Sequence, residues 1–132
     1  MKRRNLLKLA AVTLPASAQQ SGAAKTSVRI VSKREMPAPF TGMEATTLEV
    51  TIPPGGSSSP HRHGGMVLGY VIEGDFSFAI DDQPPKVLHA GESFYEPPGA
   101  RHTTSANGHS SKTCRILATI IAEKGKELTT PA

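Results

Sequence analysis

Apolar and polar residues alternate along much of the chain, or apolar residues gather in short runs, and glycine and proline separate these segments. Alternation with a period of two is typical of a β-strand, because successive side chains point to opposite faces. No stretch shows a helical period of useful length. The pattern therefore predicts strands over residues 27–34, 46–52, 67–72, 76–80, 86–89, 91–97, 102–105 and 112–122.

The segments between these strands carry strong turn signals. Pro53-Pro54-Gly55-Gly56 ends one strand, and Gly74 and Asn107-Gly108 mark later turns. Residues 36–40 contain two prolines, which lack the backbone N–H that a strand interior needs. The run at residues 67–72 is apolar and β-branched, as expected of a strand buried in a barrel. Together these features predict an all-β fold, a small β-barrel or jelly roll.

Length and composition agree with a single domain of this kind. The chain has 132 residues, enough for one domain, and its 12 glycines and 11 prolines suit a turn-rich all-β protein. No apolar run approaches the length of a membrane span. The one cysteine, Cys114, lies in an apolar run and is expected to be a buried thiol without a disulfide partner.

The positive charge is concentrated at the start of the chain. The net charge is +4, but Lys2, Arg3, Arg4 and Lys8 account for four of the 15 basic residues, and the first eighteen residues contain no acid. The remaining 11 basic residues balance the 11 acidic ones, so the body of the protein is neutral. The basic composition therefore gives no reason to expect a nucleic-acid partner.

The first 18 residues have the features of an export signal. A basic start is followed by an apolar core and by the small residues Ala16-Ser17-Ala18. The run from Arg3 to Lys8 resembles the bacterial twin-arginine pattern, which predicts a periplasmic or secreted protein with no membrane attachment after processing. The alternatives are an ordinary secretory signal and an N-terminal helix that is never removed. Beyond the signal we expect an N-terminal segment with an edge strand (19–45), a barrel (46–122) and a polar tail (123–132).

Three histidines are the strongest chemical signal. His61 and His63 are one residue apart, so on an extended chain both side chains point to the same face and form a candidate metal pair. His102 follows the turn Pro97-Pro98-Gly99 at the end of a later strand. A pair of histidines alone would also fit a polar surface, and the third one strengthens the metal interpretation.

At these residues the chain resembles the cupin superfamily, in its small single-domain form with an RmlC-like jelly roll. The resemblance covers residues 46–122. Two positions depart from the family's motifs: Val67 stands where the first motif has Glu, and Ala106 stands where the second has Asn, with Asn107 one residue later. The matching residues are Gly55, His61, His63 and Gly74 of the first motif, and Gly91, Pro97, Gly99 and His102 of the second.

The resemblance implies one divalent metal ion held by His61, His63 and His102, with Fe, Mn, Zn, Ni and Cu all acceptable to imidazole ligands. It also implies a small organic molecule as substrate or ligand. A dioxygenase is the first expectation for an enzyme, and an isomerase or lyase the second. The alternative is a non-catalytic module that binds or senses a small molecule or a metal. A homodimer formed through the edge strand at residues 27–34 is compatible with each.

Because Val67 cannot act as a ligand, a carboxylate from elsewhere is a possible replacement. Glu96, just before the turn that presents His102, is the best candidate for a ligand or a general base. Its other interpretation is a solvated carboxylate at the end of a strand. Tyr95 and Glu96 should face opposite sides, so only one of them can line a pocket. Weaker pocket candidates are Tyr70, Tyr95 and Arg101, whereas His89 and His109 are expected at the surface.

Overall fold

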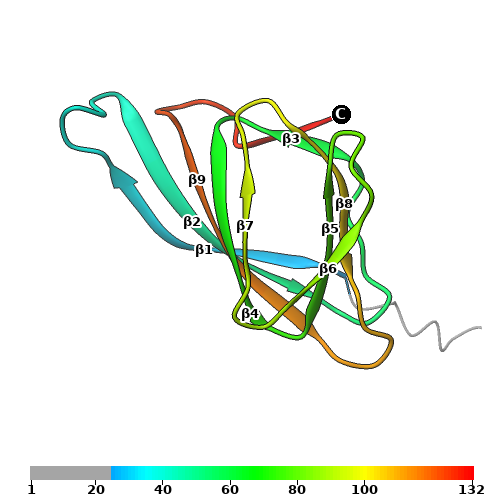
Figure 1. Ribbon diagram of the computed structural model, residues 1–132. Coiled ribbons are helices and arrows are strands. Elements are labelled where there is room, and N and C mark those ends of the chain that lie inside the picture. Colours follow the sequence, from blue (N-terminus) through cyan, green and yellow to red (C-terminus); the bar gives the residue numbers. More distant parts are fainter. Residues whose placement is uncertain (1–24) are drawn as a thin grey trace, which may run out of the picture.

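The computed structural model describes residues 25–132, so the expected export signal lies outside the described residues. This part of the chain contains ten strands and no helix, and hence no helix that could cross a membrane, which confirms the all-β prediction (Figure 1). The strands are β1 (Ser27–Glu35), β2 (Met43–Ile52), β3 (His61–His63), β4 (Met66–Glu73), β5 (Asp75–Ile80), β6 (Lys86–His89), β7 (Ser93–Glu96), β8 (Arg101–Asn107), β9 (Cys114–Glu123) and β10 (Thr129–Pro131).

The strands form two five-stranded antiparallel sheets. The first has the order β1-β2-β9-β4-β7, and we call it the large sheet because it contains the long strands β2 and β9. The second, which we call the histidine sheet, has the order β10-β3-β8-β5-β6. Neighbouring strands are often distant in sequence, as in a jelly roll. In Figure 1, β4 and β7 stand opposite β5 and β8, while β1 and β2 extend beyond the barrel.

The core lies between the sheets and follows the alternation of the strands. Buried and partly exposed residues alternate along β9, which brings Ile116, Ala118 and Ile120 to the inner face. The rings of Phe76, Phe78 and Phe94 pack together as an aromatic cluster in this core. The rings of Phe78 and Phe94 lie 5.0 Å apart between centroids, a distance typical of packed aromatic side chains.

Two elements differ from the expectation. Residues 67–72 were expected to form a strand buried in the barrel, but β4 alternates, and its outward residues Leu68 and Tyr70 are about half exposed. The reason is that the large sheet is covered on one face only. The tail also contains a strand, β10, which pairs with β3 and extends the histidine sheet next to the histidines.

Candidate metal centre

Strand pairing brings the three predicted histidines together. His61 and His63 lie on β3, and His61 is directly opposite His102 on the neighbouring antiparallel strand β8. Because side chains alternate, Arg62 points away from both, and its guanidinium donates a hydrogen bond to the backbone carbonyl of Gly99. One ring nitrogen from each histidine can be chosen so that all three lie within 4.8 Å of one another, close enough to share one metal ion.

Backbone carbonyls orient two of the three imidazoles. His61 Nδ1 lies 2.8 Å from the carbonyl oxygen of Ser59, and His63 Nδ1 lies 3.1 Å from that of Leu128. A carbonyl oxygen can only accept a hydrogen bond, so both Nδ1 atoms must carry the proton. In the neutral imidazole this tautomer leaves the lone pair on Nε2, as a metal ligand requires.

Glu96 enters the same site from the large sheet. It lies on β7 directly opposite Val67 of β4, the position at which the chain lacks the expected carboxylate. Glu96 is only 2% exposed, which rules out the solvated alternative. Its Oε2 lies 3.8 Å from His63 Nε2, and its Oε1 lies 3.2 Å from His102 Nδ1. The carboxyl therefore comes from β7 rather than from the neighbouring strand β4, where the motif would place it, and it still reaches the histidine cluster.

Burial controls the charges in this cluster. It raises the pKa of the Glu96 carboxyl to about 7. Burial, together with the neighbouring His61 and His63, lowers the pKa of His102 to about 3, and burial followed by the neighbouring His61 lowers that of His63. The imidazoles of His63 and His102 are thus neutral near neutral pH, and their contacts with Glu96 are not ion pairs in the metal-free protein.

Several polar atoms of the cluster have no hydrogen-bond partner. They are Glu96 Oε1 and both ring nitrogens of His102, all fully buried. The 3.2 Å contact between Glu96 and His102 does not have hydrogen-bonding geometry, so it leaves both atoms unsatisfied. Buried polar groups without partners are costly and often mark a missing ion. Three imidazoles and one carboxyl fit a divalent transition metal.

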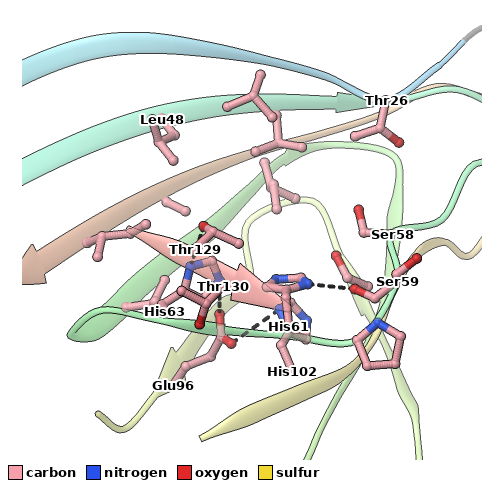
Figure 2. Close-up of a pocket in the computed structure, with 18 of the residues that line it drawn as sticks. Thr26, Leu48, Ser58, Ser59, His61, His63, Glu96, His102, Thr129 and Thr130 are labelled. Atoms are coloured by element: carbon pink, nitrogen blue, oxygen red, sulfur yellow. Dashed lines mark hydrogen bonds and ion pairs between the residues drawn. The ribbon is translucent and has the colours of Figure 1, made fainter. Parts of the chain in front are cut away.

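The cluster forms one end of a cavity of about 470 Å³ between the sheets (Figure 2). The opposite wall, from the large sheet, is aliphatic and includes Leu48, Val50 and Ile116. Ser58 and Ser59 lie on one side of the cavity in Figure 2, and Thr129 and Thr130 lie on the other. The cavity is large enough for a small organic molecule to lie against the metal ligands.

The weaker pocket candidates lie outside this cavity. Tyr70 and Tyr95 are about half exposed on the outer face of the large sheet, and Arg101 is exposed beside the buried His102. Each is next in sequence to an inward residue, so strand alternation turns it outward. Of the two surface candidates, His89 is exposed and its Nδ1 lies 2.8 Å from Asp75 Oδ1, and His109 is half-buried in a loop.

The tail supplies residues of the site that the sequence did not indicate. Leu128 orients His63 through its carbonyl, and Thr129 adds a hydroxyl 3.1 Å from the same Nδ1 atom. The aliphatic wall was also not predicted as part of a site, although the alternation in β2 and β9 marks its residues as inward. Cys114 is fully buried, and burial raises its thiol pKa to about 11, so it is not a nucleophile.

Two facing antiparallel sheets, with imidazoles and a carboxyl gathered at one end of the interior, define a jelly-roll barrel with a potential metal site. The Cupin domain family (Cupin_2) matches residues 48–120, and the chain belongs to this family. No curated protein gives a significant match.

Several solved structures share the fold. An uncharacterised protein with a double-stranded β-helix domain from Klebsiella pneumoniae is 15% identical, with a TM-score of 0.64 over 93% of this chain and 98% of that one. An RmlC-like cupin from Methanocaldococcus jannaschii is 15% identical, with a TM-score of 0.62 over 80% and 86%. The polyketide cyclase RemF from Streptomyces resistomycificus is 26% identical, with a TM-score of 0.59 over 80% and 70%.

We predict that Glu96→Gln alters the pH dependence of stability of the metal-free protein. The pKa of Glu96 rises from its ordinary value of 4.5 to about 7 on folding, so the folded state holds an extra proton between these values. This group therefore makes the parent protein less stable as the pH rises through that window. Glutamine does not titrate, so the free energy of unfolding of the variant should rise relative to that of the parent between about pH 4.5 and pH 7, by up to about 3 kcal/mol.

Urea unfolding of both proteins with a chelator, at about pH 5 and about pH 8, measures this difference. Comparing the variant with the parent cancels the opposite contribution of His102, whose lowered pKa makes the protein more stable as the pH rises. Glu123→Gln, at an exposed position outside the cavity, serves as the control. A Glu96→Gln difference that is equal at both pH values would contradict a carboxyl protonated by burial.

Proposed function

We propose that the protein holds one divalent metal ion through His61, His63, His102 and Glu96, and that it binds or acts on a small organic molecule in the adjoining cavity. The observation that carries the proposal is the convergence of one ring nitrogen from each histidine within 4.8 Å, beside Glu96 Oε1 and the His102 ring nitrogens, which are buried without hydrogen-bond partners. When bound, such a metal can polarise an oxygen of the ligand or support redox chemistry.

The side chains and backbone around the site provide an apolar wall, oriented imidazoles and a carboxyl. The aliphatic wall opposite the histidine cluster makes the interior of the cavity largely apolar, and electrostatic interactions are stronger in such surroundings than in water. The carbonyls of Ser59 and Leu128 fix the two imidazoles of β3 before any ion binds. Glu96 serves as the fourth ligand, and a carboxylate that is not bound to metal could instead accept a proton from the substrate, in the role of general base.

A dioxygenase-like reaction is the first candidate for catalysis. Its support is the predominance of neutral imidazole ligands, which accept iron and copper as readily as non-redox ions. The second candidate is a non-redox isomerase or lyase reaction, and the similarity to the cyclase RemF favours retaining it. The competing function is binding or sensing without turnover. Oxygen consumption by the iron-loaded protein with candidate substrates would separate the first from the other two.

We predict that the purified protein retains a divalent metal in nearly equimolar amount, and that His61→Ala, His63→Ala and His102→Ala each lose it, because each removes one of the convergent imidazoles. Metal content would be measured by mass spectrometry on protein purified with and without air. His89→Ala removes an exposed histidine outside the cavity and should keep the metal. A parent protein that takes up no metal even on reconstitution would overturn the proposed centre.

The strand register offers a test of Glu96 as a ligand. Glu96→Val should weaken metal binding, because it removes the carboxyl from the cluster. Val67 lies directly opposite Glu96, so Val67→Glu in the Glu96→Val background returns a carboxyl to the same cavity from the neighbouring strand. We expect this double variant to recover metal binding. If Glu96→Val binds metal as tightly as the parent, Glu96 is not a ligand and the general-base role remains.

We propose that the protein forms a homodimer through β1. β1 is an edge strand, and its inward residues Val28 and Ile30 are about 60% exposed although they continue the aliphatic rows of Val50 and Leu48. An unpaired apolar edge of this kind favours association. Light scattering should show a dimer, and Ile30→Lys should shift it to monomer. A parent protein that is monomeric at high concentration would contradict the dimer.

We also propose that residues 1–18 direct export through the twin-arginine route to the periplasm or the medium, on the support of the sequence pattern. In a bacterial host, the exported form should begin at Gln19, as read by N-terminal sequencing. Changing Arg3 and Arg4 together to lysine should leave the protein in the cytoplasm, because the paired arginines distinguish this route. Normal export of that variant would argue for the ordinary secretory route, and no processing at all would argue against a signal.

A further inference from the structure

The part of the cavity wall that the structure describes has histidines and a carboxyl at one end and no lysine or arginine. Among the described residues that line it, half are apolar, six carry hydroxyls, and the ionisable groups are three histidines and Glu96. Neither lysine nor arginine is among these lining residues. The one group that can carry a formal charge, apart from the histidines, is therefore an acid, which repels anions.

Three arginines on strands that line the cavity, one each on β1, β3 and β9, are held on the outside. Arg62 lies between two inward histidines but points outward to the carbonyl of Gly99. Arg115 and Arg29 both bind Glu49 on the outer face of the large sheet, with N–O distances of 3.0 Å. These guanidinium groups already have acceptors, so none is free to turn into the cavity for a ligand.

A charged group on the ligand would consequently have only one favourable position. At the metal-facing end, an ionised oxygen donor would be balanced by the ion. Elsewhere in the cavity an anion would face Leu48, Val50 and Ile116, or neutral hydroxyls, without a counter-charge. Burying a charge without a partner costs far more than burying an apolar group of the same size.

Resting on the metal centre proposed above, we propose that the ligand is a largely apolar organic molecule whose only acidic group is the oxygen donor that faces the metal. The aliphatic wall binds its body, and the hydroxyls of Ser58, Ser59, Thr129 and Thr130 accept a neutral polar group at the rim. Sugar phosphates, nucleotides and molecules with a second carboxylate are excluded as ligands. At about 470 Å³, the cavity suits a body of moderate size.

Two chelators that differ only at the far end test this class. Octanohydroxamate and suberic acid monohydroxamate present the same metal-binding group and the same chain length, but one ends in a methyl group and the other in a carboxylate. We expect calorimetry on the metal-loaded protein to show about tenfold or greater preference for octanohydroxamate. Equal affinity, or a preference for the carboxylate, would overturn the proposed ligand class while leaving the metal centre intact.

A charge placed at the rim should change this preference. Ser58 lines the cavity, whereas the adjacent Ser57 does not, so Ser58→Lys and Ser57→Lys form a matched pair. Ser58→Lys should shift the ratio of the two affinities by several-fold in favour of the carboxylate probe, and Ser57→Lys should leave that ratio unchanged. Identical behaviour of the two variants would contradict the placement of the ligand body in this cavity.

A third comparison distinguishes a wrong ligand class from an absent metal centre. If the protein retains no metal, the same comparison is made on the metal-free protein with octanamide and suberic acid monoamide, which cannot chelate, by ligand-observed NMR. Selective binding of octanamide would support the apolar ligand class without a metal. Equal binding of the two amides, or binding of neither, would overturn it.

Discussion

The alternation of side chains along paired strands is the constraint on which the site depends. On β3 it turns His61 and His63 inward and Arg62 outward, and the register with β8 places His102 directly beside His61. On β7 the same alternation separates Glu96 from Tyr95. A shift of one residue in either strand would exchange every inward group for an outward one. The positions of the candidate metal ligands are therefore fixed by the backbone pairing rather than by local loops.

This constraint also explains how the chain keeps a carboxyl without the usual motif residue. Val67 and Glu96 are partners across one strand pair, and both face the interior. A carboxyl at either position enters the same cavity, since directly opposed side chains lie about 5 Å apart between Cβ atoms. The register continues through Ile120 to Thr46 on β2. A single inward row thus joins the cluster to the apolar wall of the large sheet.

Much of this arrangement could be predicted from the sequence, because strand alternation and turn residues are local signals. The spacing of His61 and His63, and the turn before His102, placed all three in one site. The inward orientation of Glu96 could not be chosen over that of Tyr95, since both satisfy the alternation and only the pairing of β7 with β4 decides between them. The polar strand β10 gave no signal, because it is stabilised by its pairing with β3 rather than by burial.

The link between the tail and His63 has a consequence for biosynthesis. Leu128 and Thr129 follow every other residue of the centre in the sequence, yet their carbonyl and hydroxyl hold the His63 ring. During translation the three histidines and Glu96 are therefore synthesised before Leu128 and Thr129, the residues that orient His63. The His63 ring lacks these two partners until the end of the chain pairs with β3, so the geometry of the histidine cluster is complete only when the last strand has folded into place.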